Sequence, residues 1–250
     1  MLDNDKLNVV HLGDCTELAK KLYPAECVDL ILTDPPFGIT YKSQISKNHD
    51  VILNDKYEEF TRDLNKWFET MQYLIKKNGV ILMFCAGGGK MPSSAVATLE
   101  GLKYFKLINT IIWDKGCGGI GWHYKPQYET VLMFSKQDSG YNWYDESHTV
   151  TNVIKCSRII PTAGDHPTQK PTSLLKKFIK YHTKEGDVVC DLFSGSGATL
   201  VAAKELGRNY FGFELFEKYH SLSNYNLSKA VSMKSVDLLS IFNQPVTAEV

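Results

Sequence analysis

The sequence has no excess of charge of either sign. Lys and Arg together number 28, as do Asp and Glu, so the formal net charge of the 250 residues is zero at pH 7. This balance excludes a protein that attracts nucleic acid through its overall charge, because long-range attraction requires a net field. Any nucleic-acid partner must be bound by a local group of basic residues.

Closely spaced cysteines and long apolar runs are also missing. A structural zinc site requires closely spaced ligands, whereas the cysteines are spread over the chain: Cys15, Cys27, Cys85, Cys117, Cys156 and Cys190. We expect reduced thiols and no metal site. No run approaches the roughly 20 apolar residues that span a bilayer, and the N-terminus does not resemble a signal peptide. These absences predict a cytoplasmic protein with no membrane partner.

Two common nucleotide-binding loops are incomplete. Residues 86–90 read Ala-Gly-Gly-Gly-Lys, but Met91 stands where a phosphate loop requires Ser or Thr. Gly195 and Gly197 begin a dinucleotide pattern, yet residues 198–200 supply no third glycine. These departures disfavour a phosphate-loop enzyme and an NAD enzyme.

The motif Asp34-Pro35-Pro36-Phe37 directly follows the apolar run 28–33. A short apolar run that ends in a turn predicts a buried strand of a parallel sheet, and such sheets bind ligands beyond the carboxyl ends of their strands. The prolines give a stiff turn with free carbonyl oxygens. An acid, carbonyl oxygens and an aromatic ring suit a flat molecule with an exocyclic amino group. The alternative is a turn that merely caps a strand.

A second pattern occupies residues 186–214. A predicted strand 186–190 leads into Asp191-Leu192-Phe193-Ser194-Gly195-Ser196-Gly197, a helix 198–206 and a strand that ends at Glu214. This order is typical of the nucleoside-binding half of a doubly wound fold, in which the final acid accepts hydrogen bonds from ribose. Asp191 before the glycines suits a ligand with a charged amino-acid tail, such as S-adenosylmethionine. A structural glycine turn is the alternative.

Asp14 follows a predicted strand, Leu7–Leu12, and allows two interpretations. It can cap the helix 16–22 in a capping box with Glu17. It can also be an acid at the carboxyl end of a strand that holds the amino group of a ligand.

Further segments predict the elements around this centre. We expect a helix Tyr57–Ile75 ended by Asn78-Gly79, a strand 80–85, and a hairpin of strands 107–113 and 128–134. The loop 38–55 is interpreted as a flap, and residues 114–127 and 137–164 as a target-recognition insert.

Basic and aromatic residues in these loops are candidates for DNA binding, because cations suit a phosphate backbone and aromatic rings suit splayed bases. The alternative is a solvated loop with half-buried aromatics. The candidates are Lys42, Lys47, Lys115, Trp122, His123, Tyr124, Lys125, Lys155 and Arg158.

The sequence resembles the β-class, circularly permuted amino methyltransferases of DNA over nearly its whole length. Their acid-Pro-Pro-aromatic motif precedes the cofactor loop, as it does here. The matching segments are Gly13-Asp14-Cys15, Thr33-Asp34-Pro35-Pro36-Phe37, Tyr128-Glu129-Thr130-Val131-Leu132, His166-Pro167-Thr168-Gln169-Lys170-Pro171, the loop from Asp191 to Gly197, and Phe213-Glu214. Leu192 replaces a common Pro, a change that leaves the acid Asp191 in place. Phe37-Gly38 replaces a common Tyr-Asn, and this second change leaves the finer contacts to the base open.

The resemblance implies one α/β domain, 1–250, with a doubly wound, mostly parallel seven-stranded sheet of the Rossmann-like methyltransferase type and one antiparallel strand. Its cofactor would be S-adenosylmethionine. Asp14, beside Cys15, would contact adenine, Glu214 the ribose, and Asp191 with Phe193, Ser194, Gly195, Ser196 and Gly197 the methionine part. Thr168 and Lys170 would lie beside the carboxylate end of the cofactor, with Asp34 close by.

The implied substrate is double-stranded DNA, and the reaction belongs to DNA methylation in restriction-modification. A flipped base would present its amino group to Asp34 and the Pro35 carbonyl while Phe37 stacks on the base, and Pro36 completes this catalytic motif. No cysteine follows a proline, which disfavours cytosine C5 chemistry. Asp at the first motif position favours adenine N6, with cytosine N4 as the alternative.

Less favoured alternatives are an RNA or protein-glutamine methyltransferase and a DNA-binding module that has lost activity. A homodimer and a cognate restriction endonuclease are further partners that the resemblance allows.

Overall fold

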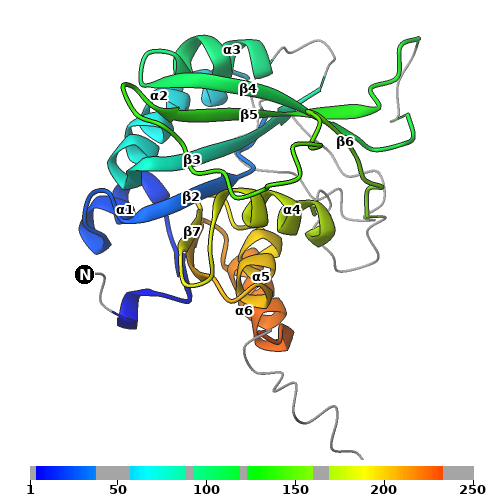
Figure 1. The fold of residues 1–250 in the computed structure, drawn as a ribbon. Helices are drawn as coiled ribbons and strands as arrows, with labels where there is room; N and C mark the ends of the chain where they lie inside the picture. Colours follow the sequence, from blue (N-terminus) through cyan, green and yellow to red (C-terminus); the bar gives the residue numbers. More distant parts are fainter. Residues whose placement is uncertain (1–3, 38–56, 88–92, 119–122, 160–168, 233–250) are drawn as a thin grey trace, which may run out of the picture.

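A computed structural model describes residues 4–37, 57–87, 93–118, 123–159 and 169–232. These residues form an α/β fold built on one eight-stranded sheet (Figure 1), which confirms the predicted fold class. The strands are β1 (Val9–Leu12), β2 (Val28–Thr33), β3 (Ile75–Ala86), β4 (Phe105–Asp114), β5 (Tyr128–Lys136), β6 (Val153–Lys155), β7 (Val188–Asp191) and β8 (Asn209–Glu214). The helices are η1 (Asn4–Lys6), α1 (Cys15–Leu22), α2 (Tyr57–Leu74), α3 (Ser93–Gly101), α4 (Thr172–His182), α5 (Ala198–Glu205) and α6 (Glu217–Lys229).

The strand order across the sheet is β1-β8-β7-β2-β3-β5-β4-β6. β5 pairs antiparallel with both β3 and β4, and every other pairing is parallel. One strand therefore runs against the rest, as predicted. The sheet has eight strands instead of the expected seven because the short β6 adds to the free edge of β4.

Helices cover both faces of the sheet (Figure 1), with α1, α2 and α3 on one face and α4, α5 and α6 on the other. Alternate residues of β2 serve the two cores: Ile31 packs with the first helix group, whereas Leu30 and Leu32 pack with the second. Every residue of β2 is buried. This confirms the expected buried strand in front of Asp34 and explains its continuous apolar run.

The boundary between α2 and β3 differs from the prediction. We expected Asn78-Gly79 to end the helix, but the strand already begins at Ile75, where it pairs with Val28. The next pairing joins Leu30 to Val80, so the intervening residues are accommodated by an irregularity in the strand. A Cβ on Gly79 would lie 3.0 Å from the carbonyl oxygen of Asp29. Glycine therefore permits a close backbone approach here instead of ending the helix.

The predicted target-recognition segment divides between the two edges of the sheet. The Asn142 amide donates to the carbonyl of Asn78, at the amino end of β3, and the Tyr144 amide donates to the carbonyl of Tyr181, at the end of α4. From there the chain returns through β6 to the carboxyl end of β4, where the Cys156 amide donates to the carbonyl of Asp114. Within the described residues of 137–164, residues 153–159 are therefore the ones that share an edge with the Asp-Pro-Pro motif, as do Lys115 and Pro126 of the first part of the insert.

Candidate active site

Four acidic side chains gather where parallel strands end. Asp14 follows β1, Asp34 follows β2, and Asp191 and Glu214 are the last residues of β7 and β8. Because these strands run parallel, their carboxyl ends lie along one edge, and all four acids line one cavity of about 760 Å³. Leu12 pairs with Glu214 across β1 and β8, which confirms that the first strand of the chain completes the site beside the last.

The Asp191 side chain is buried, and hydrogen bonds hold its carboxylate in place. Its Oδ1 accepts hydrogen bonds from the Thr33 hydroxyl at 2.9 Å and from the Phe193 amide at 3.1 Å. Burial raises the pKa of this carboxyl to about 6, because its hydrogen bonds compensate only part of the lost hydration and Asp34 adds a nearby negative charge. A cationic ligand group would favour the charged form of Asp191.

Glu214 accepts backbone hydrogen bonds with both carboxylate oxygens, and one of these bonds comes from the glycine loop. One accepts from the Gly195 amide at 2.8 Å and the other from the Phe216 amide at 2.9 Å. Burial raises the pKa of Glu214 above its ordinary value, and these amide bonds oppose the rise. Each carboxylate oxygen has a second acceptor position. Glu214 can therefore bind two hydroxyl groups of a ligand while it orders the loop.

The loop between β7 and α5 brings backbone close to the cavity. Phe193, Ser194, Gly195 and Ser196 line it, whereas Gly197 does not. Gly197 has a φ of 79° at the N-terminus of α5, and a Cβ there would lie 2.3 Å from the Ser223 hydroxyl. Its role is therefore to let the loop turn tightly against α6.

Asp14 both caps a helix and lines the cavity. Its Oδ1 accepts from the amide and the hydroxyl of Thr16, each at 2.7 Å, which confirms the N-cap of α1. Cys15 also lines the cavity but is buried, and burial raises the pKa of its thiol well above the ordinary value. The ligand-binding interpretation of Asp14 stays a prediction.

On the other side of the cavity, Asp34 forms an ion pair with Lys170. The Lys170 ammonium donates to Asp34 Oδ2, and its Nζ also lies 3.3 Å from Glu129 Oε2. Lys115 Nζ lies 3.4 Å from the other oxygen of Glu129. Lys170, Glu129 and Lys115 all line the cavity. Charged groups from four separate segments therefore meet beside the Asp-Pro-Pro motif.

Aromatic rings form the walls around these charges. Phe37 lies on the Asp34 side, where the Lys170 ammonium is 5.4 Å from the centre of its ring. Pro35 is buried, and Pro36 lines the cavity with it. Across the cavity, Phe193 packs edge-on against Trp67 of α2, with 4.9 Å between ring centres. A planar ring system can therefore stack inside this cavity.

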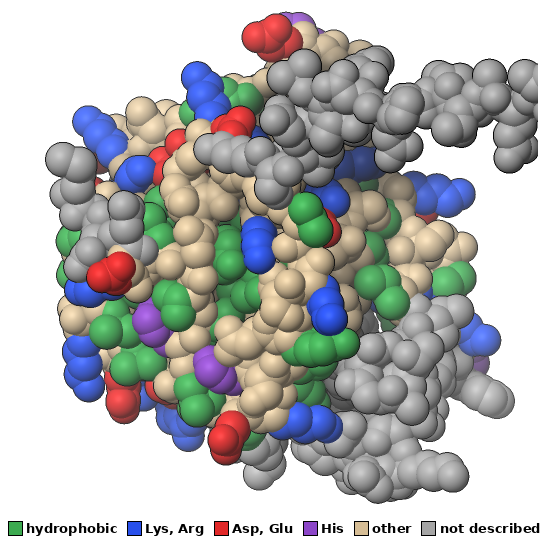
Figure 2. Space-filling model, turned by 90° about the horizontal axis from the view of Figure 1, so that it is seen from below, with side chains coloured by type: hydrophobic (Ala, Val, Ile, Leu, Met, Phe, Trp, Pro, Cys, Tyr) green, Lys and Arg blue, Asp and Glu red, His purple; other side chains and the backbone are tan. Residues whose placement is uncertain are grey.

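The candidates for DNA binding that the structure describes differ in exposure. Lys115 lies inside the cavity, while the others that the structure describes are exposed: His123, Tyr124, Lys125, Lys155 and Arg158. Lys42, Lys47, Trp122 and Thr168 lie outside the described residues. On the face seen in Figure 2, acidic and basic side chains are interspersed, in keeping with the balanced charge of the chain.

Sequence reasoning missed several residues of the site. Glu129 and Thr33 occur in motifs used for the resemblance, yet no role was predicted for either. Nothing local in α2 marks the residues that it contributes to the cavity, namely Arg62, Asp63, Lys66 and Trp67.

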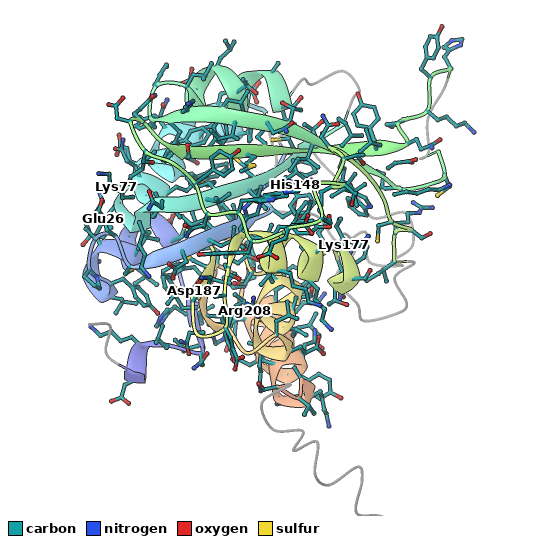
Figure 3. The ribbon with its side chains drawn as sticks, in the orientation of Figure 1. Glu26, Lys77, His148, Lys177, Asp187 and Arg208 are labelled. Atoms are coloured by element: carbon teal, nitrogen blue, oxygen red, sulfur yellow. The ribbon has the colours of Figure 1, made fainter. Side chains whose placement is uncertain are left out.

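Figure 3 shows the side chains that surround the sheet. Glu26 and Lys77 lie at the edge of the sheet where β2 and β3 begin, away from the connection between β4 and β5.

The donor and acceptor set of the cavity fits S-adenosylmethionine. Buried carboxylates stand where an ammonium group and ribose hydroxyls could bind, the glycine loop leaves room for backbone contact, and aromatic residues line the walls. Asp34 and Phe37 line another side of the same cavity, where a second molecule could bind beside the cofactor.

Comparisons with known proteins agree with this geometry. The model of a family described as DNA methylase matches residues 28–225. Type II methyltransferase M2.DpnII of Streptococcus pneumoniae is 29% identical over 252 residues, covering 90% of this chain and 91% of that protein. DNA adenine methyltransferase YhdJ of Escherichia coli (strain K12) is 26% identical over 271 residues, covering 95% and 88%.

Solved structures show the same fold. PvuII DNA methyltransferase (cytosine-N4-specific) has a TM-score of 0.71 at 21% identity and covers 87% of this chain and 85% of its own. The M1.HpyAVI–SAM complex has a TM-score of 0.67 at 25% identity and covers 88% and 98%. Among the described residues, no helix is long and apolar enough to cross a membrane. The chain belongs to the DNA methylase family whose members methylate adenine N6 or cytosine N4, and it is a DNA methyltransferase that uses S-adenosylmethionine.

Proposed function

We propose that the protein methylates the N6 amino group of an adenine flipped out of double-stranded DNA. One observation carries the proposal: a single cavity contains both the acids suited to the cofactor and the Asp34-Pro35-Pro36-Phe37 turn suited to a base. Each half alone could serve another reaction. Together they provide for a methyl donor and an amino acceptor in one cavity.

The cofactor half uses residues from three neighbouring strands. Asp191 would bind the ammonium group of the methionine part, Glu214 the ribose hydroxyls, and Asp14 the adenine amino group, with the loop from Phe193 to Ser196 alongside. When bound, S-adenosylmethionine supplies an electrophilic methyl group on a positively charged sulfur. Because Glu214 also holds the Gly195 amide, binding of the ribose and order of the loop depend on the same carboxylate.

The base half positions the target nitrogen. A paired base hides its amino group, so the nucleotide must be rotated out of the duplex, at a cost of a few kcal/mol. The Asp34 carboxylate and the Pro35 carbonyl would accept the two amino hydrogens while Phe37 stacks on the base. The nitrogen lone pair would then form the new bond to the methyl group, the electrons of the broken carbon–sulfur bond would stay on sulfur, and one amino proton would leave the nitrogen for solvent. The Asp34 carboxylate stabilises the positive charge that develops on nitrogen.

The choice of adenine is supported by the acid at the first motif position. A carboxylate is a stronger acceptor than a hydroxyl, which suits the weakly basic amino group of adenine. The relative YhdJ carries the name DNA adenine methyltransferase, whereas the likeness to the cytosine-N4-specific PvuII enzyme, at 21% identity, concerns the fold alone. Cytosine N4 is the alternative target, since it also presents an amino group beside a ring nitrogen.

DNA contact is proposed for the connection between β4 and β5 and for residues 153–159. The base of this connection flanks the cavity through Lys115 and Pro126, while Tyr124 and Lys125 are exposed beyond it. Lys155 and Arg158 are exposed at the same edge of the sheet. A cognate restriction endonuclease and a second copy of the chain remain proposed partners, the former because the relative M2.DpnII is named a type II methyltransferase.

The proposed function is tested by sequencing DNA from cells that express the protein, with modified bases identified during sequencing. We expect N6-methyladenine within one recurring short sequence, and its absence from cells that express Asp34→Ala. N4-methylcytosine in that position would replace the adenine assignment. Unmodified DNA despite soluble, cofactor-binding protein would refute the function.

A further inference from the structure

Four side chains of alternating charge stand in a row along the base half of the cavity. Lys170 bonds to Asp34 and lies 3.3 Å from Glu129 Oε2, and Lys115 lies 3.4 Å from Glu129 Oε1. The row therefore reads minus, plus, minus, plus from Asp34 to Lys115. Its two inner members are Lys170 and Glu129, with side chains 7% and 16% exposed.

Lys170 is confined to this row. Its Nζ lies 5.0 Å from the ring centre of Phe84 and 5.4 Å from that of Phe37, so apolar groups surround it apart from the carboxylates. Burial lowers the pKa of Lys170, but Asp34 and Glu129 outweigh this effect and raise the pKa above its ordinary value. The side chain is therefore an ammonium ion, and it cannot leave Asp34 without another negative partner.

This pairing conflicts with the chemistry proposed for Asp34. A target amino group is neutral before reaction, so it competes poorly for a carboxylate that already binds an ammonium ion. An ammonium ion at Asp34 would also oppose the positive charge that develops on the nitrogen. We therefore expect a shift of Lys170 away from Asp34 Oδ2 to favour productive binding of the base.

Glu129 offers the place to which Lys170 can move. Its Oε2 is buried and accepts no hydrogen bond from the residues that the structure describes, although Lys170 Nζ is only 3.3 Å away. Charge-assisted hydrogen bonds are usually about 2.7–2.9 Å long. A small shift of Nζ toward Glu129 would complete this bond and release Asp34 Oδ2 for the amino group of the base, while Lys170 keeps a carboxylate partner.

We propose that Glu129 is a positioning residue that draws Lys170 away from Asp34 when the target base enters the cavity. The inference rests on the proposed methylation of a base amino group. Glu129 touches neither the methyl donor nor the reacting nitrogen in this scheme, and it acts through Lys170. Lys115 balances the charge of Glu129 from the other side and keeps the row neutral.

The first test is Glu129→Gln, assayed for kcat and for binding of DNA and cofactor. We expect kcat to fall about ten-fold or more, the factor that corresponds to losing a hydrogen bond to a charged group. The Kd values for S-adenosylmethionine and DNA should stay within about two-fold, which is less than the effect of one typical hydrogen bond. Glu26→Gln is the matched control, because Glu26 forms an ion pair with Lys136 at 2.5 Å at the opposite edge of the sheet (Figure 3). Its kcat should equal that of the parent.

The second test separates positioning from a structural role. In a Lys170→Met background the competitor for Asp34 is absent, so adding Glu129→Gln should change kcat by less than about two-fold. An equal loss in both backgrounds would overturn the proposal, as would parental kcat in Glu129→Gln. A Lys170→Met enzyme as inactive as Asp34→Ala would also overturn it, because Lys170 would then be needed at Asp34.

Two further outcomes are distinguishable. If Glu129→Gln does not fold, Glu129→Asp takes its place. The shorter side chain keeps the negative charge but holds the carboxylate farther from Lys170. We therefore expect a lower kcat, with unchanged Kd values for S-adenosylmethionine and DNA. Parental kcat in that variant would contradict the role of Glu129. A parent protein that binds S-adenosylmethionine but methylates no DNA would refute the proposed function instead.

Discussion

Asp191→Asn should stabilise the ligand-free protein while it weakens cofactor binding. Asp191 is 3% exposed, and its pKa of about 6 in the folded protein exceeds the ordinary value of 3.8. At about 1.36 kcal/mol per pKa unit, this difference corresponds to roughly 3 kcal/mol that the charged form costs the fold. Asn keeps a side-chain oxygen that can accept from Thr33 and Phe193, so the variant removes the charge but not those bonds.

The stabilisation should depend on pH in a defined direction. A carboxyl whose pKa is raised by folding binds its proton more tightly in the folded state, so the parent loses stability as the pH rises from about 4 to above 6. At about pH 4 the carboxyl is protonated in the folded state and about half protonated in the unfolded state, so the difference in stability between parent and variant should be small. At pH 8 the variant should melt roughly 6–12 °C higher, taking about 2–4 °C for each kcal/mol in a chain of this size.

The assay is thermal unfolding of both proteins between pH 4 and pH 8, with calorimetric titration of S-adenosylmethionine at pH 8. Cofactor affinity should fall by roughly 10-fold to 100-fold in the variant, because a hydrogen bond to a charged group is lost. Affinity for the parent should also fall as the pH drops below 6, where Asp191 gains a proton. Asp29→Asn is a control of opposite sign, since it weakens the half-buried ion pair of Asp29 with Lys76 and should lower stability. Equal stability of Asp191→Asn and parent at every pH, or unchanged affinity, would refute the reasoning.

Three further predictions concern the base, the DNA and the glycine loop. Asp34→Ala should abolish methyl transfer with little change in cofactor affinity, as measured with labelled cofactor and by titration; a fully active variant would contradict the mechanism. Lys125→Ala and Arg158→Ala should weaken DNA binding and each lower the slope of log K against log salt concentration by about 1; parental binding at every salt concentration would place the basic surface elsewhere. Gly197→Ala should destabilise the fold by about 1–3 kcal/mol in denaturant unfolding, because its φ is 79° and the added Cβ would meet Ser223; an unchanged unfolding midpoint would show that the loop relaxes.

The sheet and the position of the acids at one edge of it could be predicted because their signals are local. A buried apolar strand followed at once by an acid marks both the position and the direction of the side chain, as at Asp34, Asp191 and Glu214. The resemblance then supplied the strand order that brings Asp14 beside Glu214, and the pairing of β1 with β8 confirms it.

The parts that were missed depend on contacts between distant segments. β6 has three residues, too few for a periodic pattern, and exists because the edge of β4 is free to pair. The described helix α6 buries only Ser223 and Leu227, so it presents almost no apolar stripe. The ion pair of Lys170 with Asp34 joins residues that are 136 positions apart in the sequence. No local motif predicts the carboxylate with which a lysine will pair.

The most direct test of the central claim is to identify the methylated nucleoside. Unmethylated DNA is incubated with the purified protein and S-adenosylmethionine, digested to nucleosides and analysed by mass spectrometry, with Asp34→Ala as the control. We expect N6-methyldeoxyadenosine from the parent protein and none from the control. N4-methylcytosine as the sole product would contradict the adenine assignment, and the absence of any methylated nucleoside would contradict the account of the site as a whole.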